Sequence, residues 1–274
     1  MITVVRAGPL TTIQDQGRPG YAHLGVPRSG ALDQRALRRA NALVGNPPSA
    51  AALETTLLGC ALRFDEPARV AVAGAQAVVK LDKVPVEAEV IEVPAGSVLD
   101  VGRAIHGVRS YVAVDGGLDV EPVLGSRSTD TLSGLGPPKL VNGTTLAVGF
   151  LQSPLGAADK SDISGQLELG VWLGPRDDWF SGRELFDTAY EVTPMSNRVG
   201  CRLKGAPLTR ARHGEMASEG VVLGAIQVPA DGQPLIFLAD HPTTGGYPVV
   251  GVVDDVTPLA QARPGSTVRF RELH

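Results

Sequence analysis

Long hydrophobic runs are missing from this 274-residue sequence. No window comes near the roughly 20 apolar residues that a membrane-spanning helix needs. The opening stretch, Met-Ile-Thr-Val-Val-Arg-Ala-Gly, has no basic segment ahead of a long apolar core, which is the pattern of a secretory signal. We therefore expect a cytoplasmic protein without a membrane partner.

Cysteine and histidine, the residues that most often form disulfides or bind zinc, are few and scattered. Cys60 and Cys201 are far apart, have apolar neighbours and belong to no C-x-x-C pair. The five histidines, which show no H-x-x-x-H or mixed Cys/His spacing, are His23, His106, His213, His241 and His274. This pattern predicts two buried, reduced thiols and no metal site.

Aromatic residues are also scarce, with 6 Phe, 4 Tyr and 2 Trp, whereas 33 Gly and 21 Pro are many for this length. Such a composition is typical of a chain with many turns and short strands. The 25 basic and 29 acidic residues are mixed along the chain, so no basic stripe for nucleic acid is present. We expect no nucleic-acid partner.

Several sequence motifs that bind cofactors or supply nucleophiles are absent. The chain has no G-x-x-x-x-G-K-[ST] loop for ATP and no G-x-G-x-x-G that follows a strand and opens a helix. It has no G-x-S-x-G elbow of a serine hydrolase, no Gly-Gly-Ser-Ser-Gly stretch of an amidase and no Ala-Met-Lys-Met site for biotin. No cofactor is therefore expected to be bound here by a recognisable motif.

Short strand-like runs dominate from Leu53 onward, separated by Gly, Pro or Asp at short intervals. They include residues 62–64, 70–73, 77–81, 98–101 and 110–114. Strands and helices do not alternate, which argues against a parallel doubly wound sheet. The predicted fold class is mainly β, with a closed or sandwiched architecture, two β-rich halves and a few short helices.

One amphipathic helix is predicted from Ala31 to Val44, where Gly45-Asn46-Pro47 ends it. Residues 151–166, rich in Gly, Ser, Ala, Asp and Pro, have the composition of a linker. We therefore predict an N-terminal β-rich half over 1–150, which includes the helix, and a C-terminal half over 167–274. Near the end of the chain, Thr257 is predicted to cap a helical turn that begins with Pro258.

The stretch from Gly224 to Pro248 is the main candidate for a working surface. It contains a predicted hairpin, Ala225–Val228 and Pro234–Ala239, whose turn holds Asp231 and Gly232. Polar and glycine residues then crowd together, and the candidates in this stretch are Gln227, Asp240, Thr243, Thr244, Gly245, Gly246 and Tyr247. The alternative is an ordinary solvated loop in which Asp240 only forms an Asx turn.

A second polar loop follows the predicted first strands and contains Gln14, Asp15 and Arg18. Arg18 has the shape to clamp a carboxylate or phosphate, and Asp15 is able either to orient it or to move a proton. Arg127, in a third glycine-rich patch, is a candidate member of an anion nest. The alternatives are a surface salt bridge between Asp15 and Arg18, and a long hairpin loop around Arg127.

Five stretches of this sequence resemble the family of the 5-oxoprolinase C subunit. That family is also called allophanate hydrolase subunit 2, KipI antagonist, or the biotin-dependent carboxyltransferase-like family. The stretches are 12–21 (TIQDQGRPGY), 25–33 (GVPRSGALD), 40–46 (ANALVGN), 124–129 (LGSRST) and 224–248. The resemblance covers nearly the whole chain.

The resemblance implies a cyclophilin-like β-barrel architecture, which places a barrel in the C-terminal half. It also implies work with a sister subunit, which is the 5-oxoprolinase B subunit or allophanate hydrolase subunit 1, and with a third, the A subunit. The implied activity of the complex is an ATP-dependent opening of 5-oxoproline to glutamate. One alternative is the carboxyltransferase step of a urea carboxylase system, with biotin on another chain. Another is a regulator without catalysis that binds the sister subunit.

Both chemistries in this family hold an amide or ureido group and build up negative charge on it. Gln14 and Gln227 suit the first task, whereas Arg18, Arg198 and loop N–H groups suit the second. Asp15 or Asp240 would move the proton. The sequence departs from the family at Asn197, where the usual Ser-Asp-Arg reads Ser-Asn-Arg, and at Pro137-Pro138-Lys139, where Gly-Arg is common. We expect the loop from Gln14 to Arg18 and the loop from Asp240 to Tyr247 to share one concave surface.

Purified protein should contain neither stoichiometric zinc nor a disulfide, because its Cys and His spacing offers no ligand set and both thiols have apolar neighbours. Elemental analysis and a thiol titration in denaturant, without reductant, check this. Two free thiols per chain are expected. One zinc ion per chain, or no titratable thiol, would contradict the prediction.

Overall fold

The structure is a computed structural model that describes residues 1–151, 166–212 and 214–274. The chain divides into two compact units: Met1–Arg18 with Ser29–Ile163, and Pro19–Arg28 with Ser164–His274. Within the predicted linker, 152–165 lie outside the described residues, as does His213. Among the helices that the structure describes, none has the length and apolar character needed to cross a membrane.

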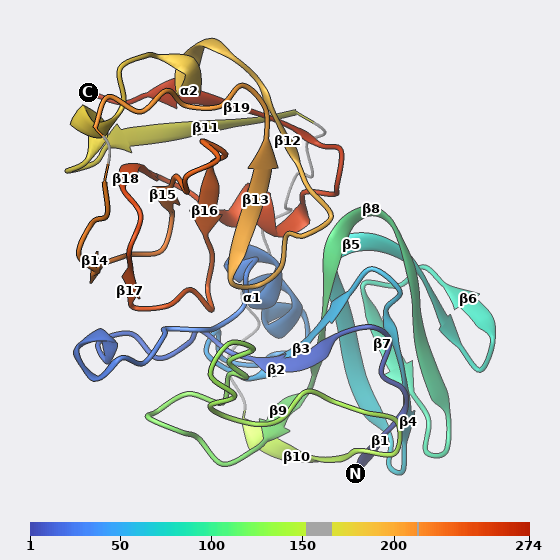
Figure 1. Ribbon diagram of the computed structural model, residues 1–274. Helices are drawn as coiled ribbons and strands as arrows, with labels where there is room; N and C mark the ends of the chain where they lie inside the picture. The colour runs from blue at the N-terminus through green and yellow to red at the C-terminus, as the bar shows by residue number, and fades with distance from the viewer. Residues whose placement is uncertain (152–165, 213) are drawn as a thin grey trace. The chain divides into compact units, whose positions relative to one another are not determined.

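The first unit is built on a ten-stranded sheet, which agrees with the predicted mainly-β class (Figure 1). Its main path runs β2-β3-β8-β4-β1-β10-β9, and β5 pairs with β6, β7 and β8. The strands are β1 (Ile2–Arg6), β2 (Thr11–Gln14), β3 (Ala52–Thr56), β4 (Cys60–Phe64), β5 (Ala68–Leu81), β6 (Val84–Val86), β7 (Val90–Val93), β8 (Val98–Val114), β9 (Gly116–Asp119) and β10 (Thr145–Leu151).

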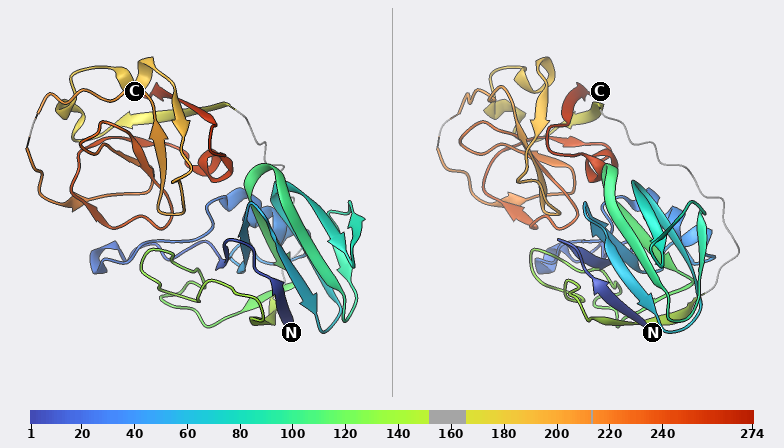
Figure 2. Two further views of the ribbon diagram at one scale, coloured as in Figure 1. Left: turned by 45° about the vertical axis from the view of Figure 1, so that its right-hand side comes forward. Right: turned by 90° about the vertical axis from the view of Figure 1, so that its right-hand side faces the viewer.

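Two long strands, β5 and β8, form the backbone of this sheet. They pair antiparallel from Val70 opposite Val114 to Leu81 opposite Leu99 and run side by side in every view (Figure 1 and Figure 2). The sequence predicted two separate short strands in each of them, which was wrong. Register shifts near Gly74, whose φ is +92°, let one strand continue through the interruption that the pattern showed.

The predicted helix is confirmed as α1 (Gln34–Leu43), three residues shorter at its start than expected. It begins there because the Asp33 side chain accepts a hydrogen bond from the Ala36 N–H at 2.9 Å, which satisfies a donor of the first turn. Leu37 and Ala40 are buried and pack with Ala71 of β5 and other small residues of the sheet. Small side chains on the sheet let the helix approach closely.

A second core lies among the strands of the same unit and consists of larger aliphatic side chains. Its members include Ile2, Val4, Leu62, Phe64, Leu99 and Val101. Each such side chain, when fully buried, contributes about 1.5–3 kcal/mol relative to an exposed position. Cys60 belongs to this core, and Cys201 is buried in the second unit; both are free thiols, as predicted.

The second unit is a closed barrel with the strand order β11-β18-β15-β16-β13-β12-β19. The barrel closes through β11 and β19, which pair parallel with Leu167 opposite Val268. Its strands are β11 (Gln166–Leu173), β12 (Tyr190–Val192), β13 (Gly200–Lys204), β15 (Ala225–Gln227), β16 (Leu235–Phe237), β18 (Val249–Val253) and β19 (Thr267–Glu272).

The remaining elements of the second unit are short. Two strands, β14 (Glu219–Gly220) and β17 (Thr244–Gly245), form a separate small sheet. The helical pieces are η1 (Ala22–Leu24), η2 (Asp177–Trp179), α2 (Glu184–Asp187) and η3 (Thr257–Gln261).

The predicted hairpin is confirmed, because β15 and β16 pair antiparallel with Ile226 opposite Ile236. In its turn, Gly232 has φ +74° and the Asp231 carboxylate accepts from the Gln233 N–H at 3.1 Å. The predicted cap at Thr257 was wrong. Thr257 lies inside η3, and the Asp255 carboxylate accepts from its N–H at 2.8 Å, so the aspartate two residues earlier satisfies a donor of the first turn.

A buried polar network joins α1 to the sheet of the first unit. The Tyr111 hydroxyl donates to Glu54 Oε2 at 2.7 Å and accepts from the Asp33 N–H at 2.8 Å. Glu54 Oε2 also accepts from the Leu32 N–H at 3.0 Å. Burial, with the charges of Glu54 and Asp33, raises the pKa of Tyr111 well above its usual value. The folded state therefore keeps the phenol neutral, and this contribution to stability decreases as the pH rises past about 10.

Tyr111→Phe should lower the free energy of unfolding by about 1–3 kcal/mol, because it leaves the Asp33 N–H and an oxygen of Glu54 buried without this partner. Denaturant unfolding of the purified chain measures the loss. Tyr21→Phe is the control, since Tyr21 is only partly buried. Equal stability of the two variants would show that the network does not fasten the helix.

Candidate functional site

Asp15 is the centre of the polar loop that follows β2. Its Oδ1 accepts from the hydroxyls of Ser126 and Ser128, both at 2.6 Å, and from the Gly17 N–H at 2.8 Å. Its Oδ2 accepts from the Arg127 N–H at 2.6 Å. Asp15 thus fills the backbone concavity at residues 126–128, in which the sequence predicted an anion nest.

Arg18 and Gln14 are buried beside Asp15. The Arg18 guanidinium donates to the Val123 carbonyl at 3.3 Å, to the Ser29 hydroxyl at 3.2 Å and to the Ser128 carbonyl. Gln14 donates to the Thr129 carbonyl at 2.9 Å, while its own carbonyl oxygen is buried with no hydrogen-bond partner among the described residues.

The first unit therefore brings four predicted site residues together, namely Gln14, Asp15, Arg18 and Arg127. The Arg127 side chain turns back to the Val120 carbonyl, to which its Nε donates at 2.6 Å. All four side chains have partners within this unit. The charged side chains hold this loop in place through hydrogen bonds to hydroxyl and main-chain groups, and the Gln14 oxygen is an acceptor without a partner among the described residues.

In the second unit, Arg198 and Asp240 form a buried, two-pronged ion pair. Arg198 Nε and Nη2 donate to the two carboxylate oxygens at 2.8 and 3.0 Å, and both side chains are fully buried. Arg198 precedes β13 and Asp240 follows β16, and these strands are neighbours, with Gly200 opposite Phe237. The pairing of the strands thus brings together two charges that are 42 residues apart.

The loop after Asp240 is fastened at three points. His241 Nδ1 lies 2.6 Å from the Pro242 carbonyl, the Val221 N–H donates to the Thr243 carbonyl at 3.0 Å, and Thr244–Gly245 pairs with Glu219–Gly220. His241 is 6% exposed, and the sequence did not single it out as a candidate site residue.

Gln227 connects this loop to the barrel. Its side-chain N–H donates to the Tyr247 carbonyl at 3.0 Å, and a Cβ at Gly245 would stand 2.4 Å from the same nitrogen. Only glycine fits Gly245 without displacing Gln227. The second unit therefore brings Gln227, the Thr243–Tyr247 loop and the Arg198–Asp240 pair together, all of which the sequence predicted as site residues.

Arg176 and Glu219 form a second pair that sequence reasoning missed. Arg176 Nε donates to one carboxylate oxygen at 3.1 Å, and Nη2 donates to the other. The hydrogen bond from Arg176 lowers the pKa of Glu219, and Glu219 raises the pKa of Arg176. Because Glu219 belongs to β14, this pair connects η2 to the small sheet that contains Thr244. No sequence motif marks it.

A pocket of about 470 Å³ opens beside the Thr243–Tyr247 loop. Its lining includes Trp179, Arg210, Glu215, Met216, Gly246 and Tyr247. Gly246 and Tyr247 were predicted as substrate contacts, whereas Trp179, Arg210 and Glu215 were not. The missed residues come from two segments that are distant in sequence from the loop, so only the folded unit brings them to it.

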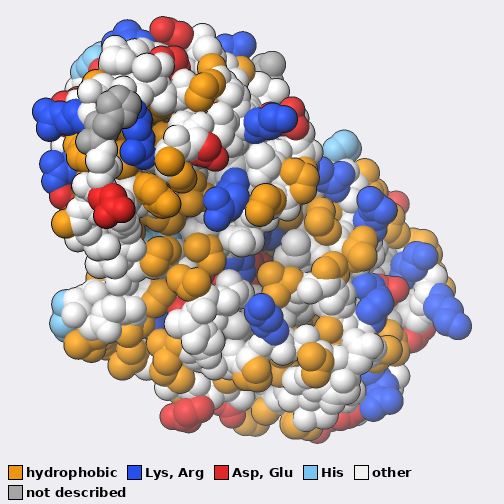
Figure 3. All heavy atoms as spheres, in the orientation of Figure 1, with side chains coloured by type: hydrophobic (Ala, Val, Ile, Leu, Met, Phe, Trp, Pro, Cys, Tyr) orange, Lys and Arg blue, Asp and Glu red, His pale blue; other side chains and the backbone are white. Residues whose placement is uncertain are grey.

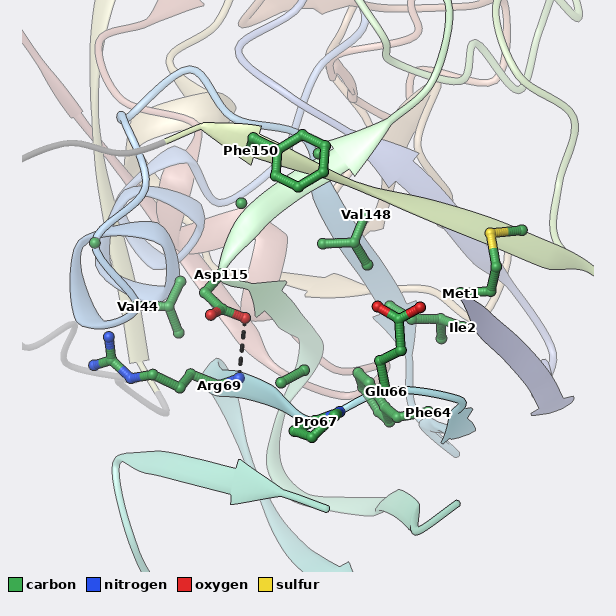
Figure 4. Close-up of a pocket in the computed structure, with 14 residues that line it drawn as sticks. Met1, Ile2, Val44, Phe64, Glu66, Pro67, Arg69, Asp115, Val148 and Phe150 are labelled. Carbon is green, nitrogen blue, oxygen red and sulfur yellow. Dashed lines mark hydrogen bonds between the residues drawn. The ribbon is translucent and has the colours of Figure 1, made fainter. Parts of the chain in front are cut away.

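The first unit has a pocket of about 460 Å³ as well (Figure 4). Apolar side chains such as Phe64 and Phe150 form much of its lining, and two of its charged groups, Asp115 and Arg69, are already engaged. The Asp115 carboxylate accepts from the Arg69 N–H at 3.0 Å, and Arg69 Nε lies 3.4 Å from Glu92. None of the predicted site residues lines this pocket, so we do not place the site there.

The face drawn in Figure 3 carries basic and acidic side chains on both units. Within the described part of the chain, no group of three His, Cys, Asp or Glu side chains is placed to hold a metal ion. Burial raises the pKa of Cys60 from 9.0 to about 12, so its thiol is not a ready nucleophile.

Comparison with known proteins gives the family. The family model for the carboxyltransferase domain, subdomain A and B, matches residues 24–272. This chain belongs to that family. It is 38% identical to the 5-oxoprolinase C subunit of Escherichia coli (strain K12), over 98% of this chain and 90% of that one.

Two further relatives extend the comparison. The chain is 33% identical to the 5-oxoprolinase C subunit of Haemophilus influenzae, over 100% of this chain and 91% of the relative. The crystal structure of the Kluyveromyces lactis urea amidolyase superposes with a TM-score of 0.92 at 31% identity, covering 100% of this chain and 19% of that one. The carboxyltransferase fold thus occurs in proteins that are named for two different activities.

The two predicted loops belong to different compact units. The loop from Gln14 to Arg18 is in the first, and the loop from Asp240 to Tyr247 is in the second. Their convergence on one surface therefore stays a prediction, and so do the catalytic roles of Asp15, Arg18 and Asp240.

Asp240→Asn should lower the free energy of unfolding by about 3–5 kcal/mol, because it leaves the Arg198 cation buried without its counter-charge. Thermal unfolding and turnover of the assembled enzyme are measured on the same samples. The double variant Arg198→Met with Asp240→Asn is the matched control and should recover part of the stability, since no charge stays buried.

The same samples separate a structural Asp240 from a catalytic one. If Asp240 moves a proton, replacing it by Asn should lower turnover about a hundredfold even in samples that remain folded. Normal turnover per folded molecule, with a lowered midpoint, would remove Asp240 from the catalytic residues.

Proposed function

We propose that this chain is one subunit of a 5-oxoprolinase, which opens the ring of 5-oxoproline to glutamate with the consumption of ATP. The observation that carries the proposal is the 38% identity to the 5-oxoprolinase C subunit of Escherichia coli over 98% of this chain. The agreement extends through both units, because the aligned stretch covers nearly every residue described above. The partners in this proposal are the sister B and A subunits, and the complex is cytoplasmic.

The reaction adds water across the lactam C–N bond and releases the ring nitrogen as the amine of glutamate. A catalyst for this step must hold the amide, stabilise negative charge as it grows on the carbonyl oxygen, and deliver a proton to the leaving nitrogen. In the second unit, the Thr243–Tyr247 loop offers backbone N–H groups and hydroxyls beside a pocket of suitable size. We assign substrate contact to this loop, whose position Gln227 maintains through its bond to the Tyr247 carbonyl.

The first unit supports the same proposal through its loop after β2. Gln14 and Arg127 are the side chains there that the sequence assigned to substrate, and the Gln14 oxygen, fully buried in this structure, has no hydrogen-bond partner among the described residues. Asp15 and Arg18 are each held by several hydrogen bonds to hydroxyl and main-chain groups. Such groups contribute to catalysis by keeping a site preorganised, since they need no reorganisation when charge develops.

The second candidate function is the carboxyltransferase step of a urea-degrading system, with biotin on another chain. It is favoured by the family's own description and by the TM-score of 0.92 to the Kluyveromyces lactis urea amidolyase. We rank it second because this chain covers 90% of the Escherichia coli 5-oxoprolinase C subunit but 19% of the urea amidolyase. A regulator without catalysis that binds the sister subunit ranks third.

Glutamate formation from 5-oxoproline tests the proposal. We expect no activity from this chain alone, and ATP-dependent glutamate release when it is co-purified with the A and B subunits. A parallel assay supplies urea instead, with a biotinylated carrier and the ATP, bicarbonate and biotin carboxylase that load the carrier with a carboxyl group. Full activity of the chain by itself would refute the need for partners, activity only in the urea assay would establish the second function, and no activity in either with a stable complex would favour the regulator.

A further inference from the structure

Arg210 enters the pocket of the second unit from a short paired segment. Phe180 and Arg210 form an antiparallel bridge, the Ala211 N–H donates to the Trp179 carbonyl at 2.8 Å, and the Ser181 N–H donates to the Thr209 carbonyl at 3.0 Å. This pairing fixes the main chain on both sides of Arg210. Trp179 and Arg210 consequently line the same pocket.

The Arg210 guanidinium is tethered at one end only. Its Nη2 donates to the Val228 carbonyl at 3.0 Å, and its Nε is buried with no hydrogen-bond partner among the residues described. By contrast, Arg198 pairs with Asp240, and Arg212, two residues along the chain, pairs with Asp178 at 2.5 Å.

No carboxylate in the described part of the chain forms an ion pair with Arg210. Arg210 is half-buried, and the backbone carbonyl that holds its guanidinium is neutral and supplies no counter-charge. An anion in the pocket would restore that charge. Guanidinium is the side chain whose planar fork matches a carboxylate with two parallel hydrogen bonds.

The rest of the pocket limits which anion fits. Trp179, Met216 and Tyr247 supply apolar surface for a small ring, and the volume of about 470 Å³ lies in the usual range for small-molecule sites. Glu215 also lines the pocket, and its carboxylate oxygens can accept a hydrogen bond from an N–H donor. The lining therefore suits a small cyclic molecule with one carboxylate and a separate N–H donor.

We propose that Arg210 binds the substrate's carboxylate in this pocket and so selects a carboxylated lactam over an uncharged amide such as urea. This inference rests on the proposed function, because 5-oxoproline carries both a lactam N–H and one carboxylate. Arg210 is in this role a specificity-determining residue. The position of the carboxylate at Arg210 orients the lactam ring against Gly246 and Tyr247.

Calorimetric binding to the nucleotide-free complex of this chain with its sister subunits tests the inference. The probes are 5-oxoproline and 2-pyrrolidone, the same lactam without the carboxylate. Arg210→Gln should weaken 5-oxoproline binding about ten- to a hundredfold, the usual scale for a charge-assisted pair. It should leave 2-pyrrolidone binding unchanged within about twofold, and Arg210→Lys should lie between the wild type and Arg210→Gln.

Arg212→Gln is the matched control and should bind both probes as the wild type does, because Arg212 already has Asp178 as its partner. Loss of both probes in Arg210→Gln would indicate a collapsed pocket and would overturn the carboxylate assignment, as would unchanged affinity for 5-oxoproline. Turnover is followed in parallel. A wild-type complex that binds 5-oxoproline through Arg210 but forms no glutamate would refute the proposed function and keep this site. Glutamate formation that Arg210→Gln leaves unchanged would refute this site and keep the proposed function.

Discussion

The ion pair between Arg198 and Asp240 is the interaction on which the candidate site depends most. It lies where β13 and β16 are adjacent, fully excluded from water, and the Asp240 N–H also donates to the Arg198 carbonyl at 3.1 Å. The loop that carries Thr243 to Tyr247 leaves the barrel directly from this pair. A buried pair contributes little net stability over an apolar replacement, but it tolerates only one arrangement of the strand ends. Here the ion pair therefore serves to fix the position at which the loop begins.

Asp15 performs a comparable task in the first unit with hydroxyl and backbone donors. This carboxylate accepts hydrogen bonds from Gly17, Ser126, Arg127 and Ser128. In both units, a carboxylate that looks in the sequence like an acid or base catalyst is used to hold a polar loop. The groups available to a ligand are therefore the loops themselves and those side chains whose donors or acceptors have no partner.

Arg210 differs from Arg198 and Arg176 because no carboxylate of the described residues balances its charge. A small carboxylate in the pocket that it lines would complete its pairing. This distinction bears on the choice between the two activities found in the family. A site for 5-oxoproline must recognise a carboxylate, whereas a site for urea must not require one, so one arginine in one pocket carries chemical information that the shared fold does not.

The sequence by itself determined the β class, the helix at α1, the hairpin of β15 and β16, and the loops that hold the candidate residues. These features follow from local signals: the apolar period of 3.6, glycine where φ is positive, and clusters of polar turn residues. The family likewise followed from contiguous motifs such as residues 12–21. Local signals failed at β5 and β8, because a bulge and a strand break produce the same interruption in a pattern. Only the tertiary structure paired Arg198 with Asp240 and Arg176 with Glu219, and only it set Arg210 beside Trp179 and Tyr247. These partners are distant in sequence, and no spacing along the chain encodes the pairing of segments that brings them together.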